Sequence, residues 1–352
     1  MAPVKRRTDL AVLLLHNVDS SWEVSEIAAV NEAVSAMTCA LMQEGHPVVE
    51  VPVTHGDLEV ILKPFSPENY IVFNWCEELP GIPRSDVRVT EILENLKFPY
   101  TGAPPQVLSL SWDKAAVKTL LNQNTIPLPQ WRLFSTPEPD DWNCFPAIVK
   151  PAYEHCSFGI NAEAVVMNTD DLMKRISFVR DTFKQPAIVE DFIDGREFHV
   201  TLWGNSNVEM LPPAEMDFAA FNNLRDRLCT FDSKFNPGSL HYENIDMRIP
   251  AKLTARETRR LKQTALQAYQ ATGCRDYARI DLRLREGIFY VLDVNPNADL
   301  SPETSMVYAA ETVGLTYGAV GSRLINLAAR RHPILSGGQM IHGRPRLQAV
   351  ME

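Results

Sequence analysis

The sequence predicts a protein made of α/β and α+β segments, and three patterns indicate this fold class. An apolar strand pattern, a helical stretch and a second strand follow one another at the start of the chain, which is typical of a parallel sheet. Strand and helix patterns keep alternating as far as residue 295. The 352 residues, 45% of them hydrophobic, are enough for two or three domains with ordinary cores.

Residues 1–108 are the predicted N-terminal α/β domain. Strands are expected at LAVLLL (10–15), HPVVEVPV (46–53) and YIVFNW (70–75), with helices at about 25–44 and 86–96. Gly45 is expected to end the first helix, because glycine adopts the left-handed conformation at a helix end without strain. The basic start could suggest a signal peptide, but the apolar run after it is too short and fits a buried strand better.

Residues 109–195 form the second predicted segment, also α/β. It is expected to contain a helix from about Asp113, a proline-rich surface connection, a strand at AIVK (147–150), a loop through Gly159, a helix at about 170–184 and a strand at AIVEDF (187–192). These elements alternate in the way that a second layered unit requires.

Residues 196–331 are the third predicted segment, and residues 332–352 are expected to be a tail. The segment begins with a strand at REFHVTLWG and continues to a helix that Thr254 and Glu257 would open as a capping box and Gly273 would close. A last helix at about 316–331 ends in two arginines, which suit the negative end of a helix dipole. The tail has no hydrophobic period.

Charge and cysteine content narrow the partners and the compartment. The formal net charge is −10 and the basic residues are scattered, so the long-range field repels nucleic acid. No apolar stretch reaches the length of a membrane span, and no membrane partner is expected. The six cysteines show neither a CxxC motif nor regular spacing, which favours a reducing, cytoplasmic setting.

Acidic and amide side chains alternate on two strands that we expect to pair as a hairpin, DYARIDLRLR and FYVLDVN. With Glu286, Gly287 and Ile288 as the hairpin loop, strand pairing would place Asp281 opposite Asp293 and Arg279 opposite Asn295. A loop with an even number of residues would instead place the two acids on opposite faces of the sheet.

Two facing carboxylates require a positive neighbour. At roughly 5 Å they repel each other by about 3 kcal/mol at an effective dielectric constant of 20. Asp281, Asp293 and Asn295 offer hard oxygen donors, which favour Mg²⁺, and Arg279 could then face a developing negative charge. Alternatively the acids pair with arginines as a surface charge ladder, and the strands alone leave both interpretations open. The arginines of that ladder are Arg279, Arg283 and Arg285.

Seven stretches stand in one order along the chain and together resemble a known family. They are FPYTG, SWDKAAVKTLLNQNTIPLPQW, AIVKPAYEHCSFG, AIVEDFIDGREFHV, TFDSKF, DYARIDLRLR and YVLDVNPNADLSP. Over residues 71–331 the sequence resembles the D-alanine–D-alanine ligase branch of the ATP-grasp superfamily, in a subgroup with an NPNxDLSP motif. The resemblance implies an ATP-grasp fold with an N-terminal Rossmann-like (pre-ATP-grasp) domain, and a homodimer.

The resemblance also implies an activity and the residues that carry it. ATP would phosphorylate a carboxylate, and an amine would attack the acyl phosphate to give an amide, ADP and phosphate, with Mg²⁺ or Mn²⁺ as the metal. The implied phosphate ligands are Lys114, Lys150 and Lys234; the implied adenine and ribose contacts are Glu190, the backbone through Ile193, and Glu197; the implied metal ligands are Asp281, Asp293 and Asn295. Arg279 would steady the acyl phosphate, with Ser157 of a lid loop and Lys234 of a second, mobile loop acting beside it.

The lid and the substrate positions depart from the family pattern. The lid loop AYEHCSFGI carries bulky residues and matches the family only at Ser157 and Gly159. At the positions that hold the amino acids in the D-alanine enzymes the chain has Ser21, Cys156 and Phe235, with Glu23 or Glu26 as a possible replacement for the family's glutamate. A buried polar site rejects analogues strongly, so such changes predict a different substrate.

The turn NPNADLSPETS is a further departure. Asn297, Ser301 and Ser305 could receive a substrate carboxylate, or the stretch could be a proline-rich turn capped by Ser301 and Asp299. The histidines show no metal-ligand spacing, and His199 on an alternating strand fits a structural role. We therefore predict a ligase that acts on an amino acid other than, or in addition to, D-alanine. The alternatives are a true D-alanine–D-alanine ligase and a non-catalytic, ATP-binding regulatory protein.

Overall fold

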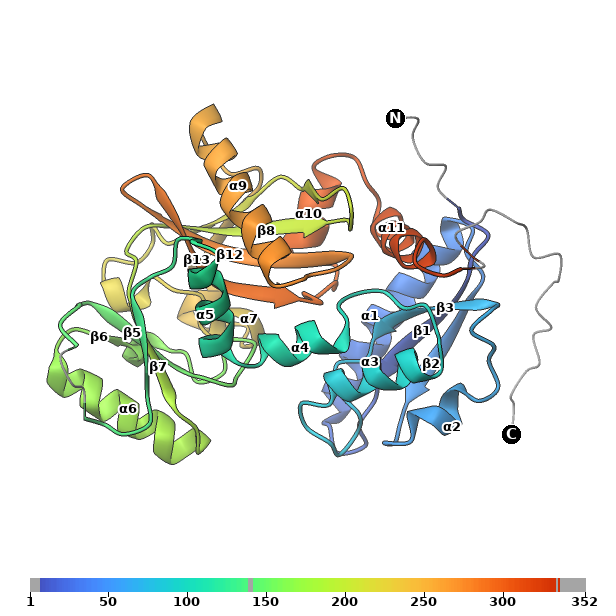
Figure 1. The fold of residues 1–352 in the computed structure, drawn as a ribbon, viewed down its shortest axis with the longest axis horizontal. Helices are drawn as coiled ribbons and strands as arrows, with labels where there is room; N and C mark the ends of the chain where they lie inside the picture. Colours follow the sequence, from blue (N-terminus) through green and yellow to red (C-terminus); the bar gives the residue numbers. More distant parts are fainter. Residues whose placement is uncertain (1–6, 139–141, 334, 336–352) are drawn as a thin grey trace. The chain divides into compact units, whose positions relative to one another are not determined.

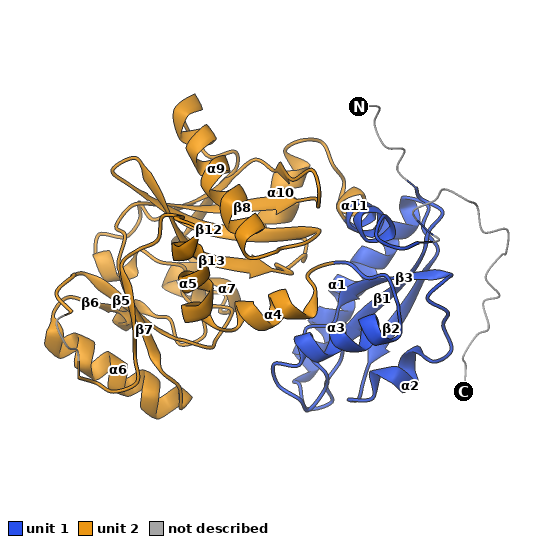
Figure 2. Ribbon diagram, in the orientation of Figure 1, with its two compact units in different colours: residues 1–101, 321–352 blue, residues 102–320 orange. Residues whose placement is uncertain are grey.

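The computed structural model describes residues 7–138, 142–333 and 335 (Figure 1). The chain forms two compact units, unit 1 with residues 1–101 and 321–352 and unit 2 with residues 102–320 (Figure 2). Residues 321–331, expected in the third segment, cluster with unit 1 instead. The division of residues 109–331 into two segments stays a prediction, and the predicted tail lies outside the described residues except for residues 332, 333 and 335.

Unit 1 contains a three-stranded parallel sheet in the order β2–β1–β3, which confirms the parallel sheet predicted for this part of the chain. Its strands are β1 (Ala11–Asn17), β2 (Val48–Val53) and β3 (Tyr70–Trp75), and its helices are α1 (Val24–Gln43), α2 (Leu58–Leu62) and α3 (Asp86–Asn95). Helix α11 (Tyr317–Ala329) begins in unit 2 and ends in unit 1. The short α2 was not predicted, because five residues are too few to show a helical period.

The core of unit 1 explains why its first strand is apolar at successive positions. Val12, Leu13, Leu14 and Leu15 are all fully buried, as in parallel strands that are covered on both faces. Helix α11 approaches closely at Gly321, where an added Cβ atom would lie 2.9 Å from side-chain atoms of α1. Helix α11 is therefore packed against α1 in unit 1.

Unit 2 contains two antiparallel sheets. The larger has the order β11–β10–β8–β12–β13, with β9 also paired to β8, and the smaller has the order β4–β7–β5–β6. The larger sheet consists of β8 (Arg196–Trp203), β9 (Glu209–Met210), β10 (Ala214–Asp217), β11 (Asp246–Arg248), β12 (Tyr277–Arg285) and β13 (Ile288–Pro296). The smaller consists of β4 (Trp131–Phe134), β5 (Ala147–Pro151), β6 (Val165–Val166) and β7 (Ala187–Asp191).

The helices of unit 2 include the capped helix expected from the sequence. They are α4 (Pro105–Ser111), α5 (Lys114–Gln123), α6 (Thr169–Phe183), α7 (Asp232–Phe235), α8 (Leu240–Asn244), α9 (Ala255–Ala271) and α10 (Ser305–Glu311). The side chains of Thr254 and Glu257 form a capping box at the start of α9, and Gly273 follows its end with a φ of 75°, so this prediction is confirmed. No helix among the described residues is long and apolar enough to cross a membrane.

The β12–β13 hairpin has a different loop from the one predicted but the predicted register. Its turn is Glu286-Gly287, with φ values of 53° and 76°, so Ile288 belongs to the strand and the three-residue loop was wrong. Asp281 nevertheless pairs with Asp293 and Arg279 with Asn295. A register shift between Asp281 and Leu282 supplies the missing residue, because Leu292 is extra on the partner strand and forms a β-bulge.

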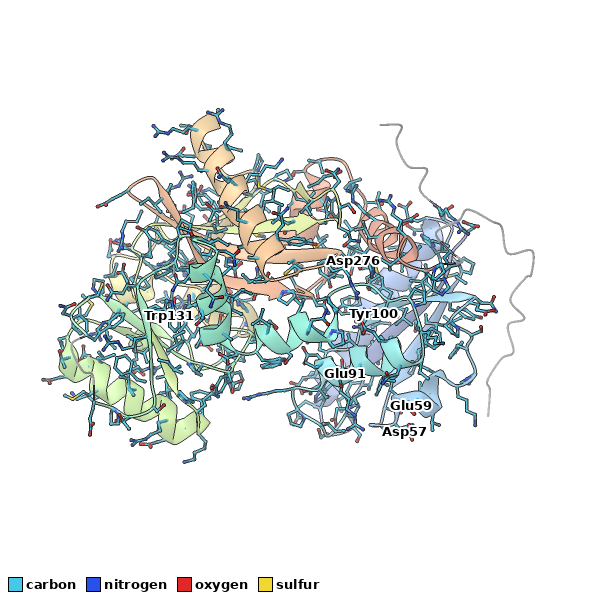
Figure 3. The ribbon with its side chains drawn as sticks, viewed as in Figure 1. Asp57, Glu59, Glu91, Tyr100, Trp131 and Asp276 are labelled. Carbon is cyan, nitrogen blue, oxygen red and sulfur yellow. The ribbon has the colours of Figure 1, made fainter. Side chains whose placement is uncertain are left out.

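A buried carboxylate joins the start of unit 2 to β12. Asp276, labelled in Figure 3, is fully buried and accepts hydrogen bonds from the Gly102 amide at 2.9 Å and from Asn205 Nδ2 at 3.0 Å. These hydrogen bonds hold the backbone just before β12, which carries Arg279 and Asp281.

Candidate active site

One face of β8, β12 and β13 carries a row of ionisable and amide side chains. The strand register pairs Glu197 with Arg283, His199 with Asp281, Asp281 with Asp293, and Arg279 with Asn295. The alternate residues of β8 and β12, such as Val200 and Ile280, are fully buried in the core. Period two along the strands thus gathers the polar groups on one face.

Asp281 lies in a charge-assisted network with its neighbours. Arg279 donates to both carboxylate oxygens, from Nε at 2.7 Å and from Nη2 at 3.0 Å, and Asn295 Nδ2 lies 3.0 Å from Oδ2. Burial lowers the pKa of Arg279, but the charge and hydrogen bonds of Asp281 outweigh it, so the net shift is upward. The guanidinium presents a fixed bidentate fork to the carboxylate.

Asp293 has a cation of its own from a different element. Lys114 is the first residue of α5, and its Nζ donates to Asp293 Oδ2 at 3.0 Å. Burial raises the pKa of Asp293, but the positive charges of Lys114, His155 and Lys150 hold it well below its usual range. The two facing acids are therefore each neutralised separately, one from the sheet and one from a helix.

The charge-ladder alternative holds for only one of the three arginines that it named. Arg279 pairs with Asp281, whereas Arg283 pairs with Glu197 and Arg285 with Asp191. Of the three, Arg283 is the one that is almost completely buried. Arg283 is therefore part of a buried ion pair and not of a surface charge ladder.

A buried triad connects α5 to the smaller sheet. Lys118 of α5 and Lys150 of β5 each place Nζ 3.2 Å from Glu190 Oε2, and Glu190 on β7 is only 1% exposed. Lys118 Nζ also donates to the carbonyl of Leu292, the bulged residue of β13, at 3.2 Å. Sequence reasoning missed Lys118; the signal that could have found it is its place one helical turn after Lys114.

The second carboxylate oxygen of Glu190 has no hydrogen-bond partner among the described residues, although it is buried. Burial raises the pKa of Glu190, but the charges of Lys118 and Lys150 outweigh this and lower it, so the group is ionised. Burial lowers the pKa of Lys118 in turn. A buried anionic oxygen without a donor is costly, and such an atom is a natural acceptor for a ligand.

Ser157 of the lid loop lies in contact with Lys234 of α7. Lys234 Nζ, on α7, donates to Ser157 Oγ at 2.9 Å, and this hydroxyl donates to the Cys229 carbonyl at 3.1 Å. Cys156 and Ser157 both have left-handed backbones, with φ values of 55° and 60°. Cys156, next to Ser157 in the lid loop, is exposed.

Glu197 and Ile193, the implied ribose and adenine contacts, are both held by Arg283. Its Nε donates to Glu197 Oε2 at 2.7 Å, and its Nη1 donates to the Ile193 carbonyl at 2.9 Å. The guanidinium lies against the rings of Phe192 and Phe218, with its carbon 4.7 and 5.3 Å from the ring centroids. Burial raises the pKa of Glu197, but the charge of Arg283 and the contact with His199 lower it far more.

The predicted substrate residues Asn297, Ser301 and Ser305 lie after the end of β13 and each have local surroundings that the structure describes. Asn297 Oδ1 accepts from the Ala103 amide at 2.7 Å, Ser301 bonds to Asp299 through its amide at 2.8 Å and its hydroxyl at 2.7 Å, and Ser305 is the buried first residue of α10. The bonds of Ser301 match the capped-turn alternative. Glu23 lies in unit 1, where it forms a capping box with Glu26 at the start of α1.

Comparisons with known proteins agree with one another. The family model described as D-ala D-ala ligase C-terminus matches residues 122–326. An uncharacterised protein, y4sG, of Sinorhizobium fredii is 33% identical over 84% of this chain and 87% of its own, and the D-alanine–D-alanine ligase of a Marinomonas species is 29% identical over 81% and 86%.

A solved structure is similar to this chain in its fold. The D-alanine–D-alanine ligase from Bacillus anthracis, crystallised with ATP, matches with a TM-score of 0.70 and 21% identity over 91% of this chain and 98% of its own. This match confirms the ATP-grasp fold that the sequence predicted.

Proposed function

Because the chain belongs to the D-Ala-D-Ala ligase family, we propose that it is an ATP-dependent ligase that joins an amino acid carboxylate to an amine and forms ADP. The proposed substrate is an amino acid other than, or in addition to, D-alanine. The observation that supports the proposal is a set of ion pairs in unit 2 between basic side chains and carboxylates on the two sheets. The basic residues are Lys114, Lys118, Lys150 and Arg279. Positioning and charge neutralisation are most of what phosphoryl transfer requires.

The residues of the smaller sheet fit ATP. Glu190 Oε1 is a buried acceptor with no partner among the residues described, and the amino group of adenine is a donor that could bind it. Lys114 and Lys150 would hold phosphate oxygens, and Lys234 would reach them from α7, beside Ser157 of the lid loop. We propose Glu197 as the ribose contact and the backbone at Ile193 as part of the adenine edge.

The residues of the larger sheet fit a hard divalent cation. Asp281, Asp293 and Asn295 offer carboxylate and amide oxygens at adjacent positions of the β12–β13 ladder, which is the donor set that suits Mg²⁺ or Mn²⁺. When bound there, the ion would supply positive charge that neutralises phosphate oxygens. Lys114 and Arg279, which now neutralise the two acids, would then be free to donate to the phosphates and to the acyl phosphate.

We propose Glu23, Cys156, Asn297, Ser301 and Ser305 as the substrate contacts. Cys156 lies next to Ser157 in the lid, whereas Asn297, Ser301 and Ser305 lie after β13 and Glu23 lies in unit 1. Asn297 and Ser301 already hold local hydrogen bonds, so a substrate carboxylate would have to share or replace them. A homodimer, which the resemblance implies, is proposed with them.

Phosphate release measured with ATP and Mg²⁺ tests the function. The purified protein is offered D- and L-amino acids singly and in all pairs, with Asp281→Asn as the matched inactive control. We expect release that depends on a particular pair. Release only with paired D-alanine would refute the altered substrate, whereas ATP binding without release for any pair would favour the ATP-binding regulatory protein.

A further inference from the structure

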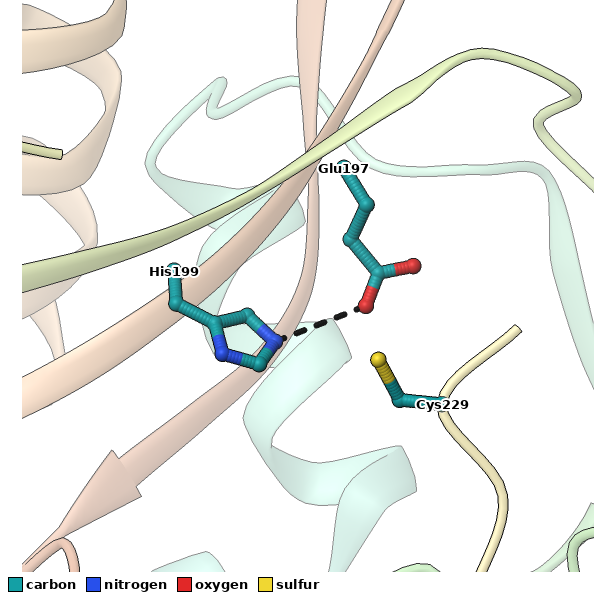
Figure 4. Close-up of side chains that lie close together, drawn as sticks. All are labelled: Glu197, His199 and Cys229. Carbon is teal, nitrogen blue, oxygen red and sulfur yellow. Dashed lines mark ion pairs between the residues drawn. The ribbon is translucent and has the colours of Figure 1, made fainter. Parts of the chain in front are cut away.

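We propose that Glu197, His199 and Cys229 form a binding site for a thiophilic divalent ion of the Zn²⁺ class. The three residues are not among the proposed Mg²⁺ ligands, although His199 Nε2 lies 4.0 Å from Asp281 Oδ1. One ligand atom from each residue, a carboxylate oxygen, an imidazole nitrogen and the thiol sulfur, lies within 4.8 Å of the other two (Figure 4). All three come from unit 2, and Cys229 is the one residue of the group that does not lie on β8.

The strand fixes two of the donors at a suitable distance. Glu197 and His199 are two residues apart on β8 and therefore project from the same face. His199 Nε2 lies 3.5 Å from Glu197 Oε1. Two ligands that are each about 2.1 Å from a tetrahedral zinc ion lie about 3.4 Å apart, so this pair needs almost no rearrangement.

Arg283 orients the carboxylate of the proposed site. It holds Glu197 Oε2 at 2.7 Å and so leaves Oε1 on the side of His199. Support of a ligating side chain by an outer hydrogen bond is typical of built metal sites. The guanidinium also offsets the negative charge of the carboxylate while the site holds no ion.

The donor types select against Mg²⁺ at this place. Thiolate and imidazole prefer Zn²⁺, Co²⁺ and Cd²⁺, whereas the oxygen set of Asp281, Asp293 and Asn295 prefers Mg²⁺. Burial, followed by the charge of Glu197, raises the pKa of the Cys229 thiol well above its usual value, so the thiol is protonated until an ion displaces the proton. Three protein ligands leave a fourth position for water or a ligand.

The site has a consequence that rests on the proposed function. If Glu197 contacts the ribose of ATP, an ion on its Oε1 competes with the nucleotide for the same carboxylate. We therefore expect Zn²⁺ to raise the apparent KM for ATP without changing kcat, at concentrations that leave Mg²⁺ in large excess.

Cobalt titration of the nucleotide-free protein tests the site directly. Co²⁺ bound by a thiolate gives an intense near-ultraviolet charge-transfer band, and we expect this band to saturate at one ion per chain. Cys229→Ser should abolish the band, and His199→Gln should weaken Co²⁺ binding at least tenfold. Cys39→Ser, which changes an exposed thiol on α1, is the matched control and should leave the titration unchanged.

The outcomes separate the site from the proposed function. A band that survives in Cys229→Ser, or that is lost in Cys39→Ser, overturns the site. Zinc-edge X-ray absorption on the unaltered protein keeps the test valid if a variant fails to fold, because one sulfur ligand at about 2.3 Å is expected and a spectrum with oxygen and nitrogen only refutes it. A cobalt band without competition against ATP would keep the metal site and refute Glu197 as a ribose contact.

Discussion

Replacing Glu190 by glutamine should change which purine nucleotide the enzyme prefers. The side chain keeps its shape, and the amide oxygen can still accept from Lys118 and Lys150, whose Nζ atoms lie 3.2 Å from Oε2. The amide nitrogen then occupies the place of Oε1, the buried acceptor that has no partner in the part of the chain that the structure describes. A donor would thus replace an acceptor at the point where we propose that the amino group of adenine binds.

The size of the effect follows from the hydrogen bond that is lost. A hydrogen bond to a charged group contributes about 1.5–3 kcal/mol, so kcat/KM for ATP should fall by about 10- to 150-fold. Inosine triphosphate carries an oxygen in place of the amino group and can accept from the new amide. The ratio of kcat/KM for ATP to that for inosine triphosphate should therefore fall by at least about tenfold.

The same substitution also removes a charge that stabilises two buried lysines. At 3.2 Å and an effective dielectric constant of 20, each lysine loses an attraction of about 5 kcal/mol, part of which is offset because the carboxylate no longer has to be desolvated. Breaking a buried ion pair costs about 3–5 kcal/mol in measured cases. The protein could therefore be partly unfolded, and the assay must not depend on the folded fraction.

The ratio of kcat/KM for ATP to kcat/KM for inosine triphosphate does not depend on the folded fraction, because the same folded molecules turn over both nucleotides. The assay measures phosphate release with each nucleotide for the unaltered protein, for Glu190→Gln, and for Glu163→Gln as a control on an exposed acid of the same unit. An unchanged ratio in a Glu190→Gln protein that turns over either nucleotide would refute the assignment of Glu190 to the base.

The remaining predictions concern the carboxylates, a buried lysine and a helix cap. Asp293→Ala should abolish turnover while thermal melting without nucleotide still shows a cooperative transition, and loss of both would point to a structural role. The pKa of Asp293 is lower in the folded protein than in the unfolded chain, so the stability that its charge contributes is present above about pH 4 and is lost as the pH falls further. The free energy of unfolding, measured by urea denaturation, should therefore decrease less between about pH 4 and lower pH in Asp293→Asn than in the unaltered protein. Lys118→Met should retain more stability than Glu190→Gln in urea, because Lys150 still neutralises the carboxylate, and the reverse order would contradict the triad. Thr254→Ala should cost about 1 kcal/mol through loss of the capping box of α9, and unaltered melting would show that the box contributes nothing.

The fold was largely predictable because its signals are local. Strand alternation, the Thr254–Glu257 capping box and glycines after helices each act over a few residues, and the structure contains the elements they predicted. Short elements such as α2 and β9 escaped, since two to five residues show no period. The hairpin shows that loop length alone does not fix the strand register. Its two-residue turn would have shifted the pairing by one residue, but the β-bulge at Leu292 restored the predicted pairs.

The candidate site was predictable where strand pairing or the family pattern named residues. Lys118 was missed because its role depends on Glu190, seventy-two residues later, and on the bulged carbonyl of Leu292. Arg283 entered only as part of the alternative surface ladder, whereas it is 3% exposed and donates hydrogen bonds to Glu197 and Ile193. The contact of His199 with Glu197 follows from strand alternation, but the approach of Cys229 does not, because a loop brings it there. Such contacts depend on tertiary packing, which no local pattern encodes.

The most direct test of the central claim follows an oxygen atom. The carboxylate of the amino acid that supports turnover is labelled with ¹⁸O, and the phosphate released during one round of ligation is analysed by mass spectrometry. Attack of that carboxylate on ATP to form an acyl phosphate predicts that one ¹⁸O atom per turnover appears in the phosphate. Unlabelled phosphate in the presence of amide product would contradict the acyl phosphate and the ligase mechanism proposed for this chain.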